Sequence, residues 1–465
     1  MTSDKPRVLL VAEHASAKFG GEAALPLHYF RVLRKRQIEA WLIVHDRTRD
    51  ELKLCVGDDF DRIFFVSDTT AHRLLWRLGQ YLPQRLAYFT AWFALRLLTQ
   101  IAQRRLVRQI VQSHRITVVH QPIPVSPKEP SLIFNVGAPV IIGPMNGGMN
   151  YPPAFEWMQS RFVHLALQVG RLLADCLNWL IPGKRQAAAL LVANTRTCHA
   201  LPKGTCGDVV RLHENGVDLS VWQPTSEPVS QVPTQPLTET KSPVTKFVFV
   251  GRLVHWKAVN LLLLAFERVA QQLPVELEII GDGPESTSLR QQARALGLLP
   301  LHELQSTDQT ICRQTQLHSS VHFLGWLSQA DCARRLQRSD VMVLPSMLEC
   351  GGAVILESMA MGIPVIATNW GGPSDYLDES CGILIEPRSQ RLFVNDLAAA
   401  MIRMAASPAL RQSMGQRGRH RAMRYFDWDV KVDAILEIYR AVLKANAPMR
   451  SLTNPENAGN AVSRV

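Results

Sequence analysis

Short apolar runs alternate with longer amphipathic segments along most of this chain. The runs at 7–12, 117–120, 246–251 and 341–344 are rich in Val, Ile and Leu, and polar residues, glycine or proline follow them, which is typical of buried strands. Between such runs lie segments with apolar residues at helical spacing, for example 261–272. This alternation predicts parallel sheets covered by helices, so we expect an α/β fold.

A change in composition divides the chain into two parts. Its 465 residues are too many for one ordinary core. Residues 223–243 contain prolines and hydroxyl side chains with almost no apolar periodicity, which predicts an exposed linker. We expect a first Rossmann-like domain over 1–222, a second over 244–425 and a helix over 426–445. Residues 446–465 have the composition of a disordered tail.

Two glutamates follow the apolar run at 341–344. Glu349 precedes Gly351 and Gly352, and Glu357 falls about a turn and a half into the helix that these glycines open. The two carboxylates can accept hydrogen bonds from sugar and ribose hydroxyls, and a helix N-terminus between them favours a diphosphate. Two glutamates at this spacing are usually a solvated helix face, so it is the surrounding glycines that favour a nucleotide-sugar pocket.

Two cations follow the apolar run at 246–251. Arg252 and Lys257 lie in the turn before the next helical segment. An arginine offers a planar fork to phosphate oxygens and a lysine offers a compact point charge, so the pair could neutralise a departing nucleoside diphosphate without a metal. The alternative is a basic surface loop. No Asp-x-Asp motif marks a metal-dependent sugar-nucleotide site, and we expect none.

These motifs resemble those of the retaining glycosyltransferases with the GT-B fold, the group 1 family that contains sucrose synthase and bacterial mannosyl- and glucosyltransferases. The resemblance implies two Rossmann-like domains facing each other across a cleft, with C-terminal helices packing back toward the first domain. It assigns the donor sugar to Glu349 and the ribose to Glu357. It also matches Gly251, Arg252 and Lys257 to a motif of the family, and it places Gly325 in a loop against the nucleotide base.

The chain departs from the family pattern at two positions. The family commonly has Phe-Gly after the first glutamate, whereas this chain has Cys350 and Gly351. Ala258 stands where the family usually has glycine after the lysine. The contact to the donor sugar is therefore expected to differ in detail.

The first domain offers weaker candidates. Gly20 and Gly21 follow the first strand, where a glycine pair could admit a phosphate or an acceptor or could form a tight turn; the resemblance favours the pocket. His120 ends the strand at 117–120, and a histidine there is expected to face the cleft. The family commonly has a histidine near the reacting carbon at this position. Asn146 and Gly147 could bind phosphate or acceptor hydroxyls, or could belong to a structural turn.

The net charge of +11 and the sequence pI near 9.4 exceed what a donor site needs. Residues 72–108 combine seven arginines with aromatic side chains, a composition suited to an amphipathic helix on an anionic bilayer. The alternative is a helix pair whose apolar side belongs to the core. Residues 162–181 are a second candidate, and neither segment reads as a bilayer span. No nucleic-acid module is evident, so we expect no nucleic-acid partner.

Residues 1–7 are short and polar and lead directly into the first strand, so we expect a cytoplasmic protein. If residues 72–108 bind membrane, the protein would be peripheral on the inner face of the plasma membrane. The eight cysteines show no Cys-x-x-Cys spacing, which favours reduced thiols over a disulfide framework or zinc site.

The sequence therefore predicts a retaining, metal-independent glycosyltransferase that moves a hexose from a nucleotide sugar to a hydroxyl of a lipid-linked or polysaccharide acceptor, with no other cofactor. The expected catalytic residues are His120, Arg252, Lys257 and Glu349. One rival is a catalytically silent GT-B protein that binds sugar nucleotides or membrane as an assembly factor. A second is a nicotinamide-dependent enzyme, which the chain fits poorly because no convincing Gly-x-Gly-x-x-Gly follows the first strand.

Overall fold

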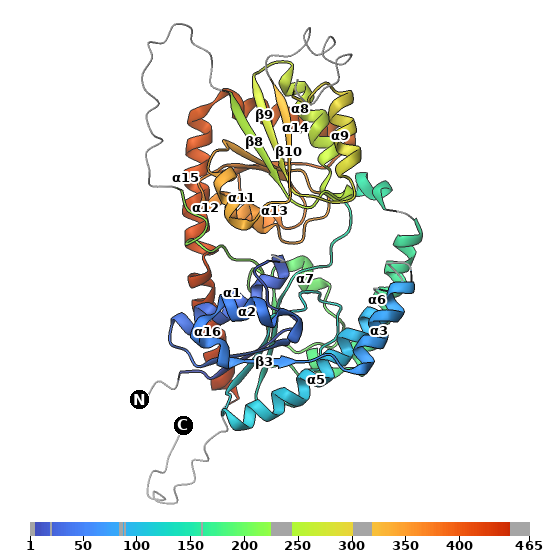
Figure 1. The fold of residues 1–465 in the computed structure, drawn as a ribbon, viewed down its shortest axis with the longest axis vertical. Coiled ribbons are helices and arrows are strands. Elements are labelled where there is room, and N and C mark those ends of the chain that lie inside the picture. Colours follow the sequence, from blue (N-terminus) through green and yellow to red (C-terminus); the bar gives the residue numbers. More distant parts are fainter. Residues whose placement is uncertain are drawn as a thin grey trace, which may run out of the picture.

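A computed structural model of the chain describes residues 5–18, 21–82, 87, 90–159, 161–224, 244–300 and 319–446. These residues form two α/β domains, one above the other in Figure 1, each built on one parallel sheet. The predicted α/β fold with two Rossmann-like domains is confirmed. Of the predicted linker, residues 225–243 lie outside the described part, as do residues 447–465 of the predicted tail.

The first sheet has seven parallel strands in the order β3-β2-β1-β4-β5-β6-β7. Its central strands are buried on both faces, which explains their continuous Val, Ile and Leu content. The strands are β1 (Val8–Val11), β2 (Ala40–His45), β3 (Ile63–Val66), β4 (Val118–Gln121), β5 (Val140–Met145), β6 (Ala189–Val192) and β7 (Val209–Arg211). The helices are α1 (Gly21–Lys35), α2 (Arg49–Cys55), α3 (Thr70–Tyr81), α5 (Ala91–Ser113), α6 (Arg161–Leu180) and α7 (Thr195–His199).

The second sheet has six parallel strands in the order β10-β9-β8-β11-β12-β13. The strands are β8 (Thr245–Val250), β9 (Val275–Ile280), β10 (Ser320–Gly325), β11 (Val341–Leu344), β12 (Val365–Thr368) and β13 (Gly382–Ile385). The helices are α8 (Val259–Ala270), α9 (Ser286–Ala295), α11 (Gln329–Leu336), α12 (Ala353–Ala360), α13 (Pro373–Tyr376), α14 (Gln390–Ala406) and α15 (Pro408–Tyr425). One apolar core joins the strands to α8, α12 and α14.

The last helix returns to the first domain. Helix α15 packs on α12, and the chain then continues into α16 (Trp428–Ala445), which packs on α1 (Figure 1, red). Trp428, Val432 and Tyr439 are buried in the same cluster as Val8 and Tyr29 of the first domain. The expectation that C-terminal helices pack back toward the first domain is therefore confirmed.

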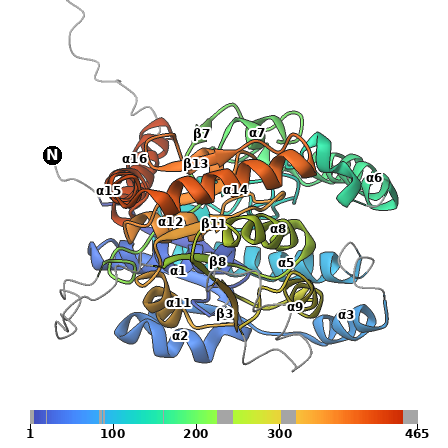
Figure 2. The same ribbon diagram turned by 90° about the horizontal axis from the view of Figure 1, so that it is seen from above.

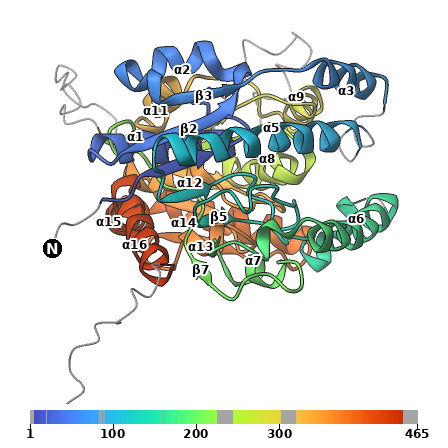
Figure 3. The ribbon, with the colours of Figure 1, turned by 90° about the horizontal axis from the view of Figure 1, so that it is seen from below.

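Helices α3, α5 and α6 extend along one side of the first domain. In the views from above and below, α3 and α6 project at the same end of the molecule. One lies near the upper edge of each view and the other near the lower edge (Figures 2 and 3). Among the described residues of 72–108, those up to Tyr81 belong to α3 and those from Ala91 onward belong to α5. Helix α3 packs on α5, and only two residues of α3, His72 and Gly79, are buried.

Candidate functional site

The second sheet changes the direction of its strand order between β8 and β11, which are neighbours. Ligands of open parallel sheets bind at such a switch point, outside the carboxyl ends of the strands. Arg252 and Lys257 lie in the loop after β8, and Glu349 lies in the loop after β11. The structure therefore brings these three predicted residues to one end of the second sheet.

Lys257 and Glu349 form an ion pair through the Lys257 Nζ and Glu349 Oε2 atoms. Their side chains are only 15% and 13% exposed, so the pair is shielded from bulk water. The contact holds each side chain in place against the other. Arg252 is exposed, and within the described ranges no carboxylate forms an ion pair with it. Lys257 thus lies beside Glu349, the residue predicted to bind the donor sugar, whereas Arg252 is open to solvent.

Glycines allow the loops at this switch point to approach each other closely. Gly352 is the N-cap of α12 with φ +86°, a conformation that favours glycine, so the helix begins directly after the Glu349 loop. A Cβ on Gly351 would lie 2.3 Å from the Asn215 amide nitrogen of the first domain. Gly325 ends β10, and its carbonyl accepts a hydrogen bond from the Gly281 N–H at 2.8 Å. The loop before α12 therefore sits against the other domain, and the first N–H groups of a helix have no partner within the helix itself.

Glu357 occupies the face of α12 that looks toward the first domain. Together with Gly21 at the start of α1, it lines an interdomain cavity of about 110 Å³. Burial raises the pKa of the Glu357 carboxyl to about 7. Gly21 and Glu357, both predicted to bind the donor, thus line one cavity although they are far apart in sequence, whereas Gly20 lies outside the described residues.

His120 does not face the cleft, and the prediction of its orientation is wrong. Its side chain is fully buried at the end of β4. Its Nε2–H donates to the Gly143 carbonyl at 2.6 Å, and its Nδ1 accepts from the Tyr439 hydroxyl at 2.6 Å. Burial lowers the His120 pKa to about 4, so the ring is neutral near pH 7. The strand-end rule failed here because α16 covers the face of β4 that carries His120.

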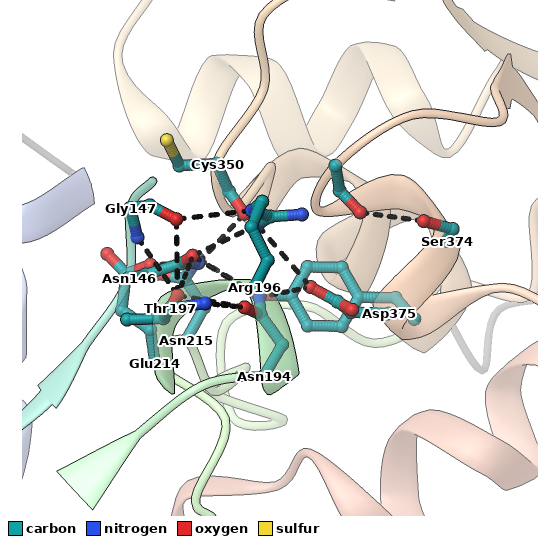
Figure 4. Close-up of polar contacts among 12 residues, drawn as sticks. Asn146, Gly147, Asn194, Arg196, Thr197, Glu214, Asn215, Cys350, Ser374 and Asp375 are labelled. Atoms are coloured by element: carbon teal, nitrogen blue, oxygen red, sulfur yellow. Dashed lines mark hydrogen bonds and ion pairs between the residues drawn. The ribbon is translucent and has the colours of Figure 1, made fainter. Parts of the chain in front are cut away.

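Asn146 and Gly147 lie where the two domains touch (Figure 4). The Asn146 amide donates to a Glu214 carboxyl oxygen and to the Cys350 carbonyl, both at 2.8 Å. The Asn146 carbonyl oxygen faces the Arg196 guanidinium at 3.3 Å. In this conformation the side chain is therefore engaged in protein contacts and holds the loop that carries Glu349.

Further polar residues join the domains beside Asn146. Asn194 donates to the Asp375 carboxylate at 2.7 Å, and Arg196 lies 3.9 Å from the same carboxylate oxygen (Figure 4). Burial raises the pKa of Glu214 to about 7, although its hydrogen bond from Asn146 acts in the opposite direction. Sequence reasoning missed Asn194, Arg196 and Asp375. Asn194 follows β6 closely, so the rule that polar residues after parallel strands line a cleft could have found it.

One group of possible metal ligands occurs among the described residues: His45, Asp68 and His72, whose ligand atoms lie within 4.8 Å of one another. Arg47 already lies 3.2 Å from Asp68 Oδ1, and both ring nitrogens of His72 contact threonine hydroxyls. The group thus has its own hydrogen-bond partners, and it lies in the first domain, away from the Glu349 loop.

Comparison with known proteins matches the second domain to a family. Residues 244–407 match the family model described as Glycosyl transferases group 1. The chain is 28% identical over 229 residues to glycogen synthase of Mycobacterium tuberculosis (strain ATCC 25618 / H37Rv), covering 49% of this chain and 47% of that protein. It is 29% identical over 243 residues to D-inositol 3-phosphate glycosyltransferase of Saccharomonospora viridis, covering 51% of each. The chain thus spans about half the length of these relatives.

Solved structures resemble the whole fold. A glycosyltransferase from Rickettsia africae aligns with a TM-score of 0.60 at 14% identity, covering 95% of this chain and all of that one. Sucrose-phosphate synthase from Thermosynechococcus elongatus aligns with a TM-score of 0.59 at 17% identity, covering 94% of this chain and all of that one. Anabaena HepE in complex with UDP and glucose gives 0.57 at 17% identity, with coverage of 94% and 100%. Residues 244–407 thus match the group 1 glycosyltransferase family, and the chain has the two-domain GT-B fold of these solved structures.

Proposed function

We propose that this protein is a retaining, metal-independent glycosyltransferase that moves a hexose from a nucleotide sugar to a hydroxyl of a lipid-linked or polysaccharide acceptor. The observation that carries the proposal is the Lys257–Glu349 pair, which lies at the switch point of the second sheet beside the N-terminus of α12. A cation, a carboxylate and a helix N-terminus at one place match the charge pattern of a sugar diphosphate.

The departing diphosphate gains negative charge as the glycosidic bond breaks. Arg252, Lys257 and the first N–H groups of α12 are fixed donors that stabilise this charge, which is the role a metal has in other sugar-nucleotide sites. When the diphosphate binds, Lys257 can turn part of its charge from Glu349 to the phosphate oxygens. The freed Glu349 oxygen then accepts a hydrogen bond from the donor sugar.

A retaining course requires the acceptor to approach on the face of the leaving group. An acceptor hydroxyl that approaches on the face of the leaving group places its proton near a diphosphate oxygen, which can accept that proton as the bond forms. We assign no protein nucleophile, because His120 is enclosed and hydrogen-bonded on both ring nitrogens. Anabaena HepE, a structural neighbour, has been solved with UDP and glucose, which supports a nucleotide sugar as the donor.

A lipid-linked acceptor is supported by the outer faces of α3 and α6. Helix α6 leaves Leu172 and Trp179 about two-thirds exposed, at 68% and 70%. Helix α3 exposes Leu74 and Tyr81 and contains no acidic residue. The one acidic residue of α6, Asp175, is paired with Lys128 at 2.6 Å. Arg73, Arg77 and Arg171 form no ion pair within the described part of the chain, and apolar side chains beside such arginines suit a peripheral contact with an anionic bilayer at the cytoplasmic side. Among the described helices, none is long and apolar enough to span a membrane.

Release of nucleoside diphosphate from a panel of nucleotide sugars tests the donor half of this proposal. We expect release from one or a few donors, unchanged by EDTA, and lost in Lys257→Ala and Glu349→Gln. NMR of the new anomeric proton would report the configuration of the product. Release that requires a divalent cation, or a product of inverted configuration, would contradict the metal-independent or the retaining part respectively. No release from any donor would favour the silent, assembly-factor alternative.

A further inference from the structure

The first sheet also has a switch point, between β1 and β4, which are neighbours. A pocket of about 360 Å³ opens there, within the usual size range of small-molecule sites. Residues from four places line it: the ends of β1 and β2, the start of α1, the inner faces of α3 and α5, and the loop after β4. Lys257, Glu349 and Glu357 lie in the other domain, and none of them lines this pocket.

The arginines of this pocket are already matched by carboxylates. Arg96 pairs with Glu129 at 2.8 Å, and Arg47 pairs with Asp68 at 3.2 Å. Glu13, which follows β1, lies half-buried in the pocket wall, and in the described part of the chain no cation forms an ion pair with it. Burial raises the pKa of Glu13, with Arg96 acting against that shift. When Glu13 is ionised, the pocket charge without an ion-pair partner is negative, which disfavours a phosphate or a carboxylate as ligand.

The remaining groups suit hydroxyls. Glu13 and Glu22 present carboxylate oxygens, which accept hydrogen bonds from alcohols, and one Glu22 oxygen already accepts from the Val125 N–H at 3.1 Å. Trp76, half-exposed, forms an aromatic wall at the pocket and stacks on Trp92 with ring centroids 6.3 Å apart. Flat aromatic walls with a few carboxylates match a ring that is apolar on its faces and carries hydroxyls at its edge.

We propose that this pocket binds a neutral sugar ring of the acceptor, with Glu13 and Glu22 accepting hydrogen bonds from its hydroxyls and Trp76 covering one face. The designation of that sugar as acceptor rests on the proposed function. The chemical selectivity, a neutral ring over a uronate or a phosphate, rests on the pocket alone.

A chain of hydrogen bonds connects the pocket to the donor loop. The Val125 N–H donates to Glu22, and the Val125 carbonyl accepts from the Asn146 N–H at 2.8 Å. The Asn146 amide in turn donates to the Cys350 carbonyl, next to Glu349. A sugar held by Glu22 is thus placed against the same framework that holds the donor carboxylate, as transfer between the two sites requires.

Binding of three probes tests the inference on the intact protein saturated with UDP. The probes are methyl glucoside, methyl glucuronide, which carries a carboxylate in place of one hydroxymethyl group, and inorganic phosphate. Saturation-transfer NMR and titration give their affinities. We expect the glucoside to bind at least about 10-fold more tightly than the glucuronide, the effect of one unfavourable charge contact. We expect Glu13→Gln to weaken glucoside binding and to remove most of this discrimination.

Matched variants separate the pocket from general damage. Trp76→Ala should weaken glucoside binding about 10-fold, whereas Trp179→Ala on α6 and Glu437→Gln on α16, both exposed, should leave it unchanged. UDP affinity should be unchanged in all four. Any one of three results would overturn the inference: the glucuronide or phosphate binds more tightly than the glucoside, the glucoside does not bind, or Glu13→Gln binds the glucoside as tightly as the parent protein does. If the parent protein binds the glucoside but releases no nucleoside diphosphate from any donor, only the proposed function would be overturned.

Discussion

At the residue scale, the donor loop holds a cation and a carboxylate against each other in a shielded place. Neither partner of the Lys257–Glu349 pair is buried enough to be inaccessible, yet both are protected from most solvent. In the proposed function such a pair is ordered before the donor binds, so less side-chain entropy would be lost on binding of the diphosphate. The exposed Arg252 side chain would become ordered only when the ligand binds.

Replacement of the cations tests their part in the reaction. Arg252→Ala and Lys257→Ala should each lower kcat by about 100-fold or more, because a fixed donor to developing charge contributes a few kcal/mol of transition-state stabilisation. Steady-state kinetics with circular dichroism as a folding check would measure this. Arg338→Ala, an exposed arginine after α11, is the matched control and should keep its rate. Parent turnover in either variant would contradict the assignment.

The two glutamates should separate binding from turnover. Glu357→Gln should weaken binding of the free nucleoside diphosphate, and Glu349→Gln should mainly lower turnover of the bound donor, because the contact to the sugar strengthens as the ring gains positive charge. Since the Glu357 pKa is raised to about 7, the ionised carboxylate forms only as pH rises through that value. Nucleotide affinity of the parent protein should therefore rise between pH 6 and pH 8.

Calorimetric titration at both pH values would measure this affinity. Glu357→Gln cannot ionise, so its affinity should show little pH dependence over the same range. The reverse pattern, with diphosphate binding abolished in Glu349→Gln and untouched in Glu357→Gln, would exchange the two roles.

At the element scale, helix α8 begins in an unusual way. Its N-cap is Ala258, buried with φ +51° and ψ +34°, a left-handed conformation that costs an L-residue with a Cβ about 1–2 kcal/mol. The resemblance expects glycine at this position, and the structure gives the physical reason. Alanine holds the turn that carries Lys257 at a cost to stability.

Ala258→Gly should therefore stabilise the protein, by up to about 1 kcal/mol after the extra flexibility of glycine in the unfolded chain is subtracted. Urea unfolding monitored by fluorescence would measure the change. Ala265→Gly, in the interior of the same helix, is a matched control and should lose stability instead. A loss of stability in both variants would show that the alanine methyl group packs more favourably than its backbone conformation costs.

Helices α3 and α6 carry the prediction about membranes. The parent protein should bind vesicles that contain anionic lipid and should be released by salt, because basic residues near such a surface contribute about 1 kcal/mol each through a screened field. Arg73→Gln combined with Arg77→Gln, and separately Leu172→Ser combined with Trp179→Ser, should weaken binding while donor hydrolysis is kept. All four side chains are exposed, so folding should be unaffected.

Vesicle co-sedimentation at low and high salt would measure this binding. The matched control is Arg338→Gln combined with Arg403→Gln in the second domain, which removes the same charge from another surface. Absence of binding by the parent protein at both salt concentrations would remove the membrane contact from the proposal.

Much of the element order could be predicted from the sequence, because strands buried on both faces leave a local signal. The run at 341–344 coincides with β11, and the run at 117–120 is displaced by one residue from β4. What local patterns do not contain is the identity of distant partners. Tyr439 lies 319 residues after His120 and covers it, and Asn146 contacts Cys350 across the domain boundary. Likewise, periodicity shows that α3 is amphipathic but not that its apolar side chains stay uncovered.

At the scale of the whole molecule, the two domains are joined by side-chain contacts at the cleft and by α16. Lys431 of α16 is buried and donates to the backbone carbonyls of His213 and Glu214, at the end of the first domain. Glu214 in turn accepts from Asn146 beside the Glu349 loop. The last helix therefore supports, through two residues, the contact that places the domains relative to each other.

Tyr439→Phe tests whether His120 is structural. The change leaves the buried His120 Nδ1 without its donor and should lower the free energy of unfolding by about 1–3 kcal/mol. Tyr425→Phe, half-exposed on α15, is the control and should have little effect. Donor turnover at saturating substrate should stay close to that of the parent. A shifted pH–rate profile with unchanged stability would instead support a catalytic role for His120.

The pH dependence of stability gives an independent check. Because burial lowers the His120 pKa from about 6.5 to about 4, the unfolded chain binds the proton more readily than the folded protein does. The contribution of His120 to stability is complete above about pH 6.5 and decreases as the pH falls toward 4. His120→Gln should flatten this part of the curve of unfolding free energy against pH.

The return of α16 to the first domain also sets an order on folding during synthesis. Strands β1 to β7 and the helices between them leave the ribosome long before Trp428, Val432 and Tyr439, which complete their core. Until then, His120 lacks its hydroxyl partner and the apolar face of α1 that meets α16 is uncovered. The strands of the second domain and helices α8 to α15 are contiguous in the chain. This domain can therefore fold without a segment that is synthesised much later. The first domain is thus synthesised first but completes its folding last. Because its apolar surface stays exposed longer, we expect a chaperone to bind this domain rather than the second one.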